Sequence, residues 1–499
     1  MSKLNILIAL TILSGTFAGG QDLDIRVIDN MSVSPHSRFG GALAIQDSLL
    51  VAGAPGETIN GNSNQGAVYI FELTDSWHYV ATLTASDGQV HDFFGGSLAI
   101  SGSNLVVSSI GDFGGSVYFF QKEDDVWVQR QKIRPANISP VGKFGSSLAM
   151  LGNDLIVGAW SHSLNNPDEG LLYHFALAGD VWSLTQEITP PVQSPGLKFG
   201  VDLALSDDFL AVGASGSDSG LKESGSVFLY RRFADDYHYS ADIKPPVSTS
   251  FQLFGESVDL DGHQLIVGSK MYVNSAGVAV GATFIFDLES ELPVLVAKLE
   301  SPNAEKNDLF GHRVAIENDL AVVTALRDNH GEFTNAGSAY IFKRDGGDWL
   351  YETTITAGEH GQNHATFGND LSLDGTELAI GAHLHSGVNE NNGNVFTLEL
   401  SGLITSTDEY GKETGDYQTQ IYPNPFKTKT TVRFSLPRAK HVKLQVFNMA
   451  GQTIATILDE QRPAGDYIVP FDAKGIPAGA YSLKLQAGPF TDTKIMVVR

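Results

Sequence analysis

Histidine is the residue type in this chain whose placement could support chemistry. His383 and His385 are two residues apart, which puts both imidazoles on one side of an extended strand, and His360 and His364 shortly precede them. Neutral imidazole is a common metal ligand. Either the four side chains converge on a metal, or they are separate, solvated loop residues. Because the sequence does not show convergence, we predict no metal and no cofactor.

Motifs typical of enzymes are missing from the sequence. It contains no HExxH zinc helix, no Gly-x-Ser-x-Gly elbow, no GxxxxGK[ST] phosphate loop and no cysteine. The glycine-rich segment 213–220 precedes no helical pattern, so it is not expected to bind phosphate. These observations favour binding over catalysis.

The elements that must position the histidines belong to a repeat. A Phe-Gly pair, an alternating apolar strand, a strand that ends in a "VGA" type turn and a Gly-led aromatic strand recur seven times. The Phe-Gly pairs are spaced by 55, 50, 55, 55, 56 and 57 residues. A fixed period of this size indicates units that bury their apolar faces against neighbouring units. The pairs begin at Phe39, Phe94, Phe144, Phe199, Phe254, Phe310 and Phe367.

Each repeat is predicted to form four antiparallel strands. The apolar residues alternate with period two, and short Asp, Asn and Gly turns separate the strands. The fourth strand often begins with tryptophan, which we expect to pack between blades. Seven such units predict an all-β fold, a seven-bladed β-propeller.

The two ends of the repeat region complement each other. The seventh copy has no fourth strand after 394–400, whereas segment 22–30 is an unassigned strand before the first copy. We predict that residues 22–28 pair with 394–400 and close the ring, which removes two open sheet edges.

One face of such a propeller carries the long loops. The segment before each Phe-Gly and the segment after each "VGA" turn share that face, which also receives His36, His91, His162 and His330. Exposed loops on a rigid ring are where binding residues gather. Trp160 begins a loop on this face and is a candidate ligand contact. The predicted ligand-binding residues are Trp160, His383, His385, His360 and His364.

The repeated phrases FGGALAI, LLVAGAP and GAVYIF resemble the FG-GAP repeat family, also found in the head of integrin alpha chains. The resemblance covers residues 22–400 and implies a propeller. Calcium-binding members carry a DxDxDG-type loop in the first hairpin of a blade. The nearest match is Asp259-Leu260-Asp261-Gly262, which we interpret as an ordinary turn, so no calcium site of the family type is expected.

The chain divides into four segments. Residues 1–20 have the pattern of a signal peptide, 21–400 form the propeller, 401–420 are a polar linker and 421–499 form a second domain. No later stretch is long and apolar enough to span a membrane. The net charge is −25; residues 421–499 hold eleven Lys+Arg against five Asp+Glu, or +6, which leaves −31 for the rest. An acidic propeller excludes nucleic acid as a partner.

The last 79 residues predict a small Ig-like β-sandwich of six alternating strands. They resemble the type A C-terminal sorting domain of the type IX secretion system of Bacteroidota, through YPNPF at 422–426, VKLQVFNMAGQ at 442–452 and GIPAGAYSLKL at 475–485. The resemblance implies export to the cell surface or beyond, with the secretion machinery as partner. It assigns the sorting signal to Tyr422, Pro423, Asn424, Pro425, Phe426, Gly451, Gly479, Tyr481, Lys494 and Arg499.

Together these features predict an exported propeller that binds an extracellular glycan or protein without catalysing a reaction. Two alternatives stay open. One is a secreted polysaccharide hydrolase or lyase with its site on the loop-rich face, which would require a carboxylate pair or an open metal site. The other is a passive structural component of a surface layer.

Overall fold

The computed structural model describes residues 12–16, 22–29, 34–403 and 420–499, apart from 220, 235, 346, 387–389, 437–439, 449–452, 463–464, 478 and 488–489. The chain separates into two compact units, Met1–Leu403 and Ile404–Arg499. Residues 404–419 of the predicted linker, and Gly451 of the predicted sorting signal, lie outside the described residues.

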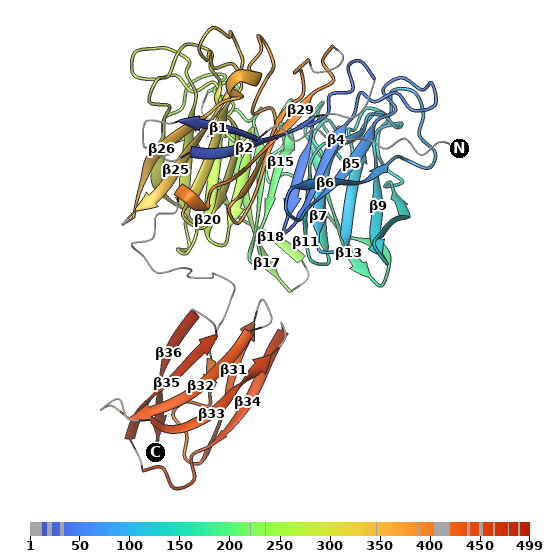
Figure 1. Cartoon of the computed structure of the whole chain (residues 1–499). Helices are drawn as coiled ribbons and strands as arrows, with labels where there is room; N and C mark the ends of the chain where they lie inside the picture. The colour runs from blue at the N-terminus through green and yellow to red at the C-terminus, as the bar shows by residue number, and fades with distance from the viewer. Residues whose placement is uncertain are drawn as a thin grey trace. The chain divides into compact units, whose positions relative to one another are not determined.

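Seven antiparallel sheets form the described part of the first unit (Figure 1). Blade 1 holds β3 (Leu43–Gln46), β4 (Leu49–Ala54), β5 (Ala67–Leu73) and β6 (Trp77–Leu83). Blade 2 holds β7 (Phe94–Ser101), β8 (Asn104–Ser109), β9 (Ser116–Glu123) and β10 (Val126–Ile133). Blade 3 holds β11 (Leu148–Leu151), β12 (Asp154–Ala159), β13 (Leu171–Ala178) and β14 (Val181–Ile188). Blade 4 holds β15 (Phe199–Leu205), β16 (Phe209–Ala214), β17 (Ser226–Phe233) and β18 (Asp236–Ile243).

The remaining blades follow the same order. Blade 5 holds β19 (Val258–Asp261), β20 (Gln264–Ser269), β21 (Ala282–Asp287) and β22 (Val294–Leu299). Blade 6 holds β23 (Phe310–Glu317), β24 (Leu320–Ala325), β25 (Ser338–Asp345) and β26 (Asp348–Ile355). Blade 7 holds β27 (Leu371–Asp374), β28 (Glu377–Ala382) and β29 (Asn394–Glu399), together with β2 (Asp22–Asp29) and β1 (Ile12–Thr16). Two short 3₁₀ helices, Gly358–His360 and Ser401–Leu403, complete the unit.

The ring closes as the sequence predicts. Strand β2 pairs antiparallel with β29, with Val27 opposite Phe396, so the N-terminal strand completes blade 7 (Figure 1). Strand β1 extends the same sheet but lies within the predicted signal peptide. The first strand of each blade contacts those of the two neighbouring blades, and the contact between β27 and β3 completes the circle.

The repeated phrase is explained by a contact between blades. In five blades the glycine of the "VGA" turn faces the carbonyl of the Phe-Gly glycine in the next blade. A Cβ on Gly53 would lie 2.1 Å from the oxygen of Gly95, and one on Gly381 would lie 2.1 Å from the oxygen of Gly40. No side chain fits at that distance, which explains the glycine in five blades; blades 2 and 6 hold Ser108 and Thr324 at this position instead.

Tryptophan and phenylalanine fill the space between blades. Trp77, Trp127 and Trp182 are buried, and the Trp182 ring packs edge-on against Phe119 of the preceding blade at 5.8 Å. The repeat phenylalanines are fully buried; Phe94 contacts the ring of Tyr118. The expected packing role of these tryptophans is confirmed.

The second unit is a sandwich of two sheets, ordered β30-β31-β34 and β33-β32-β35-β36. Its strands are β30 (Gln420–Tyr422), β31 (Lys429–Leu436), β32 (Lys440–Asn448), β33 (Thr453–Arg462), β34 (Gly465–Asp472), β35 (Gly479–Ala487) and β36 (Phe490–Val498). The all-β prediction is therefore confirmed. No helix in the described part of the chain is long and apolar enough to cross a membrane.

Candidate functional site

Every loop between the second and third strands of a blade, here the 2–3 loop, begins with the same turn. The third residue after the small residue that ends the second strand donates its N–H to that residue's carbonyl, as His385 does to Ala382 and Glu57 to Ala54, both at 3.0 Å. These third residues are polar and mostly buried. They are Glu57, Asp112, His162, Ser217, Tyr272, Asp328 and His385.

His385 is the blade 7 member of this set. Its side chain is only 4% exposed, and its Nε2 donates to the carbonyl oxygen of His360 at 2.7 Å. Both rings pack near Phe396 of β29, at 6.5 Å for His360 and 6.4 Å for His385. The structure thus brings these two predicted site residues together inside the blade, in an arrangement that holds the loop.

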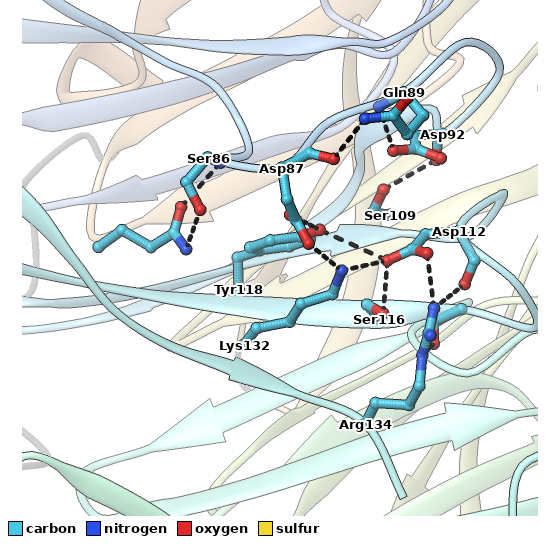
Figure 2. A network of polar contacts seen from close by, with 12 residues as sticks. Ser86, Asp87, Gln89, Asp92, Ser109, Asp112, Ser116, Tyr118, Lys132 and Arg134 are labelled. Atoms are coloured by element: carbon cyan, nitrogen blue, oxygen red, sulfur yellow. Dashed lines mark hydrogen bonds and ion pairs between the residues drawn. The ribbon is translucent and has the colours of Figure 1, made fainter.

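Blade 2 has a charged version of the same arrangement (Figure 2). Tyr118 donates to Asp87 at 2.7 Å, and Lys132 pairs with Asp87 at 2.6 Å and with Asp112 at 2.7 Å. Burial opposes the ammonium charge, yet both carboxylates raise the pKa of Lys132. Arg134 also pairs with Asp112, at 2.6 Å. A lysine kept charged in this way does not act as a base or nucleophile.

His364 belongs to a second repeated contact, between neighbouring blades. Asn335 Nδ2 donates to His364 Nδ1 at 3.2 Å. The same bond joins Asn64 to His91 at 3.0 Å and Asn391 to His36 at 3.5 Å. We call these three pairs the His–Asn clasps. Three of the histidines predicted on the loop-rich face therefore connect blades.

Trp160 and His383 occupy equivalent positions in blades 3 and 7, each following the alanine that ends the second strand. The two blades are not adjacent. Thr366 Oγ1 lies 3.3 Å from His383 Nδ1. Burial, with a contribution from the charge of Arg38, lowers the pKa of His383 to about 4, so its imidazole is neutral at pH 7. Trp160 is half-buried.

The axis of the ring holds a cavity of about 270 Å³ lined by the first strands of all seven blades. Its aspartate side chains accept hydrogen bonds from backbone N–H groups of the first strand in the next blade. Asp370 accepts from the amide of Leu43 at 2.8 Å, and Asp202 accepts from that of Val258 at 2.9 Å. Arg313 Nε donates to Asp370 at 3.1 Å. Burial raises the pKa of both aspartates, although Arg313 opposes this shift.

The segment that most resembles a calcium loop takes part in the same amide contacts. Asp259 accepts from the amide of Ile316 at 2.9 Å, and Asp261 accepts from that of Asn318 at 2.6 Å. Burial raises the pKa of Asp259 to about 7. Among the described residues no group of three His, Cys, Asp or Glu side chains is arranged to hold a metal ion.

Comparison with protein families agrees with this architecture. The FG-GAP repeat model matches residues 33–71, 77–120, 127–175, 182–230 and 294–342, and the model of the secretion system C-terminal sorting domain matches 420–499. The first unit is therefore an FG-GAP repeat propeller. The chain as a whole is an FG-GAP repeat protein with a type IX C-terminal sorting domain, which directs it to the outer-membrane surface or the extracellular space.

Comparison with solved structures finds propellers and related proteins at low identity and low TM-score. A provisionally assigned 6-phosphogluconolactonase from Bacteroides fragilis is 15% identical, with a TM-score of 0.45 over 70% of this chain and 95% of its own. The β-propeller domain of the Trilobed protease from Pyrococcus furiosus is 9% identical, with a TM-score of 0.42 over 72% and 94%. No activity transfers at these values. No curated protein matches the chain.

The sorting residues join the two ends of the second unit. Asn424 accepts from the amide of Val497 at 2.9 Å and donates to the carbonyl of Ile495 at 2.7 Å. Phe426 is buried and donates its N–H to the carbonyl of Val497 at 3.0 Å. The YPNPF segment thereby lines the terminal strand β36. Tyr481 is buried, with its hydroxyl on the carbonyl of Pro477, and Arg499 is exposed.

Other exposed side chains on the loop-rich face were not predicted from the sequence. Phe113 is 72% exposed and Phe251 49% exposed, on loops of blades 2 and 5. Lysines accompany them at Lys143, Lys198 and Lys222. A comparison of loop charge at equivalent positions of the repeat would have identified this region from the sequence.

Proposed function

We propose that this exported propeller binds an extracellular glycan or protein through its loop-rich face and catalyses no reaction. Large exposed apolar side chains on that face are the observation that supports the proposal, with Phe113 the most exposed of them. Exposed aromatic residues on rigid loops are typical of binding surfaces. In Figure 1 the longer connections crowd the upper edge of the propeller.

A hydrolase or lyase would need carboxylates free to act on a substrate. The aspartates of the axial cavity do not meet this need, because Asp202, Asp259 and Asp370 each accept a backbone amide from the next blade. Their geometry therefore favours the binding proposal over the catalytic alternative.

The proposal is tested with residues 21–499 against neutral and acidic glycans and extracellular proteins, with and without EDTA. Trp160→Ala should weaken binding at the face, whereas Asp207→Asn, in an exposed turn at the opposite end of the strands, should not. His385 is unsuitable for this test because its side chain is buried. Binding lost only in Asp207→Asn would place the ligand on the other face.

Residues 421–499 are proposed to act as an export address that takes no part in ligand binding. In a host with the type IX system, truncation after Leu400 should leave the propeller in the periplasm. The full chain should reach the surface and lose its terminal domain. A surface form that retains Arg499 would contradict removal of the domain.

A further inference from the structure

The loop-rich face consists of contact lines between blades, which we call seams. At each seam the 2–3 loop of one blade bonds to the segment before the Phe-Gly of the next blade, here its leading loop. The backbone N–H of Phe251 donates to the backbone carbonyl of Lys222 at 2.8 Å in the seam between blades 4 and 5, and the backbone N–H of Lys198 donates to the backbone carbonyl of Asp168 at 3.0 Å between blades 3 and 4. The seams occupy equivalent positions in the repeat, but their side chains differ in charge and polarity.

Three consecutive leading loops contain no acidic residue. They precede blades 3, 4 and 5 and read RPANISPVGK (134–143), TPPVQSPGLK (189–198) and KPPVSTSFQL (244–253). The leading loops of blades 2, 6 and 7 carry acidic residues instead, such as Asp87, Glu305 and Glu359, and the leading loop of blade 1 (30–38) is acid-free but holds one of the clasp histidines, His36. In a propeller with a strong negative charge, this is a local reversal.

Lys143, Lys198 and Lys222 in these three seams have no carboxylate partner among the described residues, whereas Lys244, the first residue of the third leading loop, pairs with Asp242 at 3.4 Å. Lys132, Lys270 and Lys298, elsewhere in the propeller, all form ion pairs at 2.6–2.8 Å. Lys143 and Lys198 form none, and Lys222 instead lies 5.4 Å from the centre of the Phe251 ring.

Carboxylates on the adjoining 2–3 loops are already engaged. Asp168 accepts from the Ser161 hydroxyl at 2.5 Å, and Asp218 accepts from the amide of Glu223 at 2.8 Å. Glu223, next to Lys222 in the chain, offsets one positive charge. Lys143 and Lys198 therefore remain the leading-loop cations without an ion pair among the described residues.

Exposed apolar side chains occur in the same three seams. Each seam combines an apolar residue from the 2–3 loop with an apolar residue from the leading loop and a lysine. We call this set the apolar-basic arc. It contains Phe113, Val141 and Lys143, then Leu164, Val192 and Lys198, then Leu221, Lys222 and Phe251.

From this arrangement we infer that the apolar-basic arc binds a linear acidic polysaccharide, an inference that rests on the proposed function and names its ligand class. An apolar or aromatic side chain packs against the C–H face of a sugar ring, and a lysine pairs with a uronate or sulfate group. Because the combination recurs in successive blades, it matches a polymer whose charges also recur. Unpaired lysines contribute to ligand affinity because they lose no internal ion pair on binding.

The inference is tested by titrating residues 21–499 with polygalacturonate, with neutral dextran and polyglutamate as comparisons. Polygalacturonate should bind, and its affinity should fall as NaCl rises from about 50 to about 500 mM. The variant K143Q/K198Q/K222Q should lose at least about tenfold in affinity. The matched control R38Q/K306Q/R327Q removes three cations from the same face outside the arc and should bind as the parent does. F113S/F251S should lose affinity with little change in salt dependence.

Several results would overturn the inference. Equal losses in the two triple variants, or equal binding of polyglutamate, would show attraction by charge alone. If polygalacturonate does not bind while another glycan or protein binds in a Trp160-dependent manner, the ligand class is wrong and the proposed function stands. If nothing binds the face, the proposed function itself fails.

Discussion

The two halves of the loop-rich face use the same repeat positions for different purposes. Around blades 6, 7, 1 and 2, the third residue before Phe-Gly is histidine at His36, His91 and His364, and each ring accepts a bond from an asparagine of the preceding blade. Around blades 3 and 5 the same position holds exposed Val141 and Phe251. The histidine-rich half, here the clasped half, thus uses this position to connect blades, whereas the other half leaves the equivalent side chains exposed.

Loss of ring closure, which lies in the clasped half, should have the largest effect on stability because it removes a whole strand from blade 7. Deleting residues 22–29 removes the strand opposite β29 and should lower the unfolding temperature by roughly 5–10 °C, as expected for the loss of several kcal/mol in a large domain. Differential scanning calorimetry measures this. Deletion of residues 1–20 alone is the control, and an equal drop there would show that β1, and not β2, stabilises the blade.

His385→Ala should have the second-largest effect, and this effect should be on stability and not on ligand binding. It removes a buried hydrogen bond to His360 and leaves a cavity beside Phe396, at a cost of about 2–3 kcal/mol. Thermal unfolding should shift by several degrees, while affinity below the transition stays unchanged. His330→Ala, at an exposed loop histidine, should leave both quantities unaltered. A variant that is fully stable but fails to bind would restore His385 as a ligand contact.

The axial aspartates, which both halves share, should produce a smaller and pH-dependent effect. Burial raises the pKa of Asp259 to about 7, well above its value in the unfolded chain. The folded state therefore retains a proton that the unfolded state loses, so stability falls as pH rises from about 4 to about 7. Asp259→Asn should raise the unfolding temperature by a few degrees at pH 8 and change it little at pH 4. A larger gain at pH 4 would contradict the sign of this shift.

Removing the three clasps should have the smallest effect. H36A/H91A/H364A breaks three bonds at exposed rings and should lower the unfolding temperature by no more than about 2 °C. Ligand affinity should not change. A large loss of affinity with retained folding would show that the clasped half also contacts the ligand.

The sequence predicted the fold well because its features are periodic. The spacing of Phe39 and its six equivalents gives the blades, and the missing strand after 394–400 identified β2 as the closing strand. The roles of the histidines were harder to predict from the sequence. The ligand-binding predictions for His385 and His364 depended on residue type, and comparison across repeats shows that both residues also take part in recurring contacts.

The apolar-basic arc was missed for a related reason. In the sequence Lys143 and Lys198 look like any other lysine, and only the absence of a carboxylate partner in the described residues distinguishes them from Lys132. Pairing of side chains across blades depends on three-dimensional contacts that one sequence does not reveal. The acid-free leading loops were visible in the sequence once aligned by repeat.

The most direct test measures one ligand against both halves in the same assay. Polygalacturonate is titrated by isothermal calorimetry into the parent chain, the arc variant F113S/F251S and the clasp variant H36A/H91A/H364A, with circular dichroism to confirm folding. The account predicts that the arc variant loses at least about tenfold in affinity and that the clasp variant matches the parent. Loss of binding in the clasp variant, with the arc variant unchanged, would contradict it.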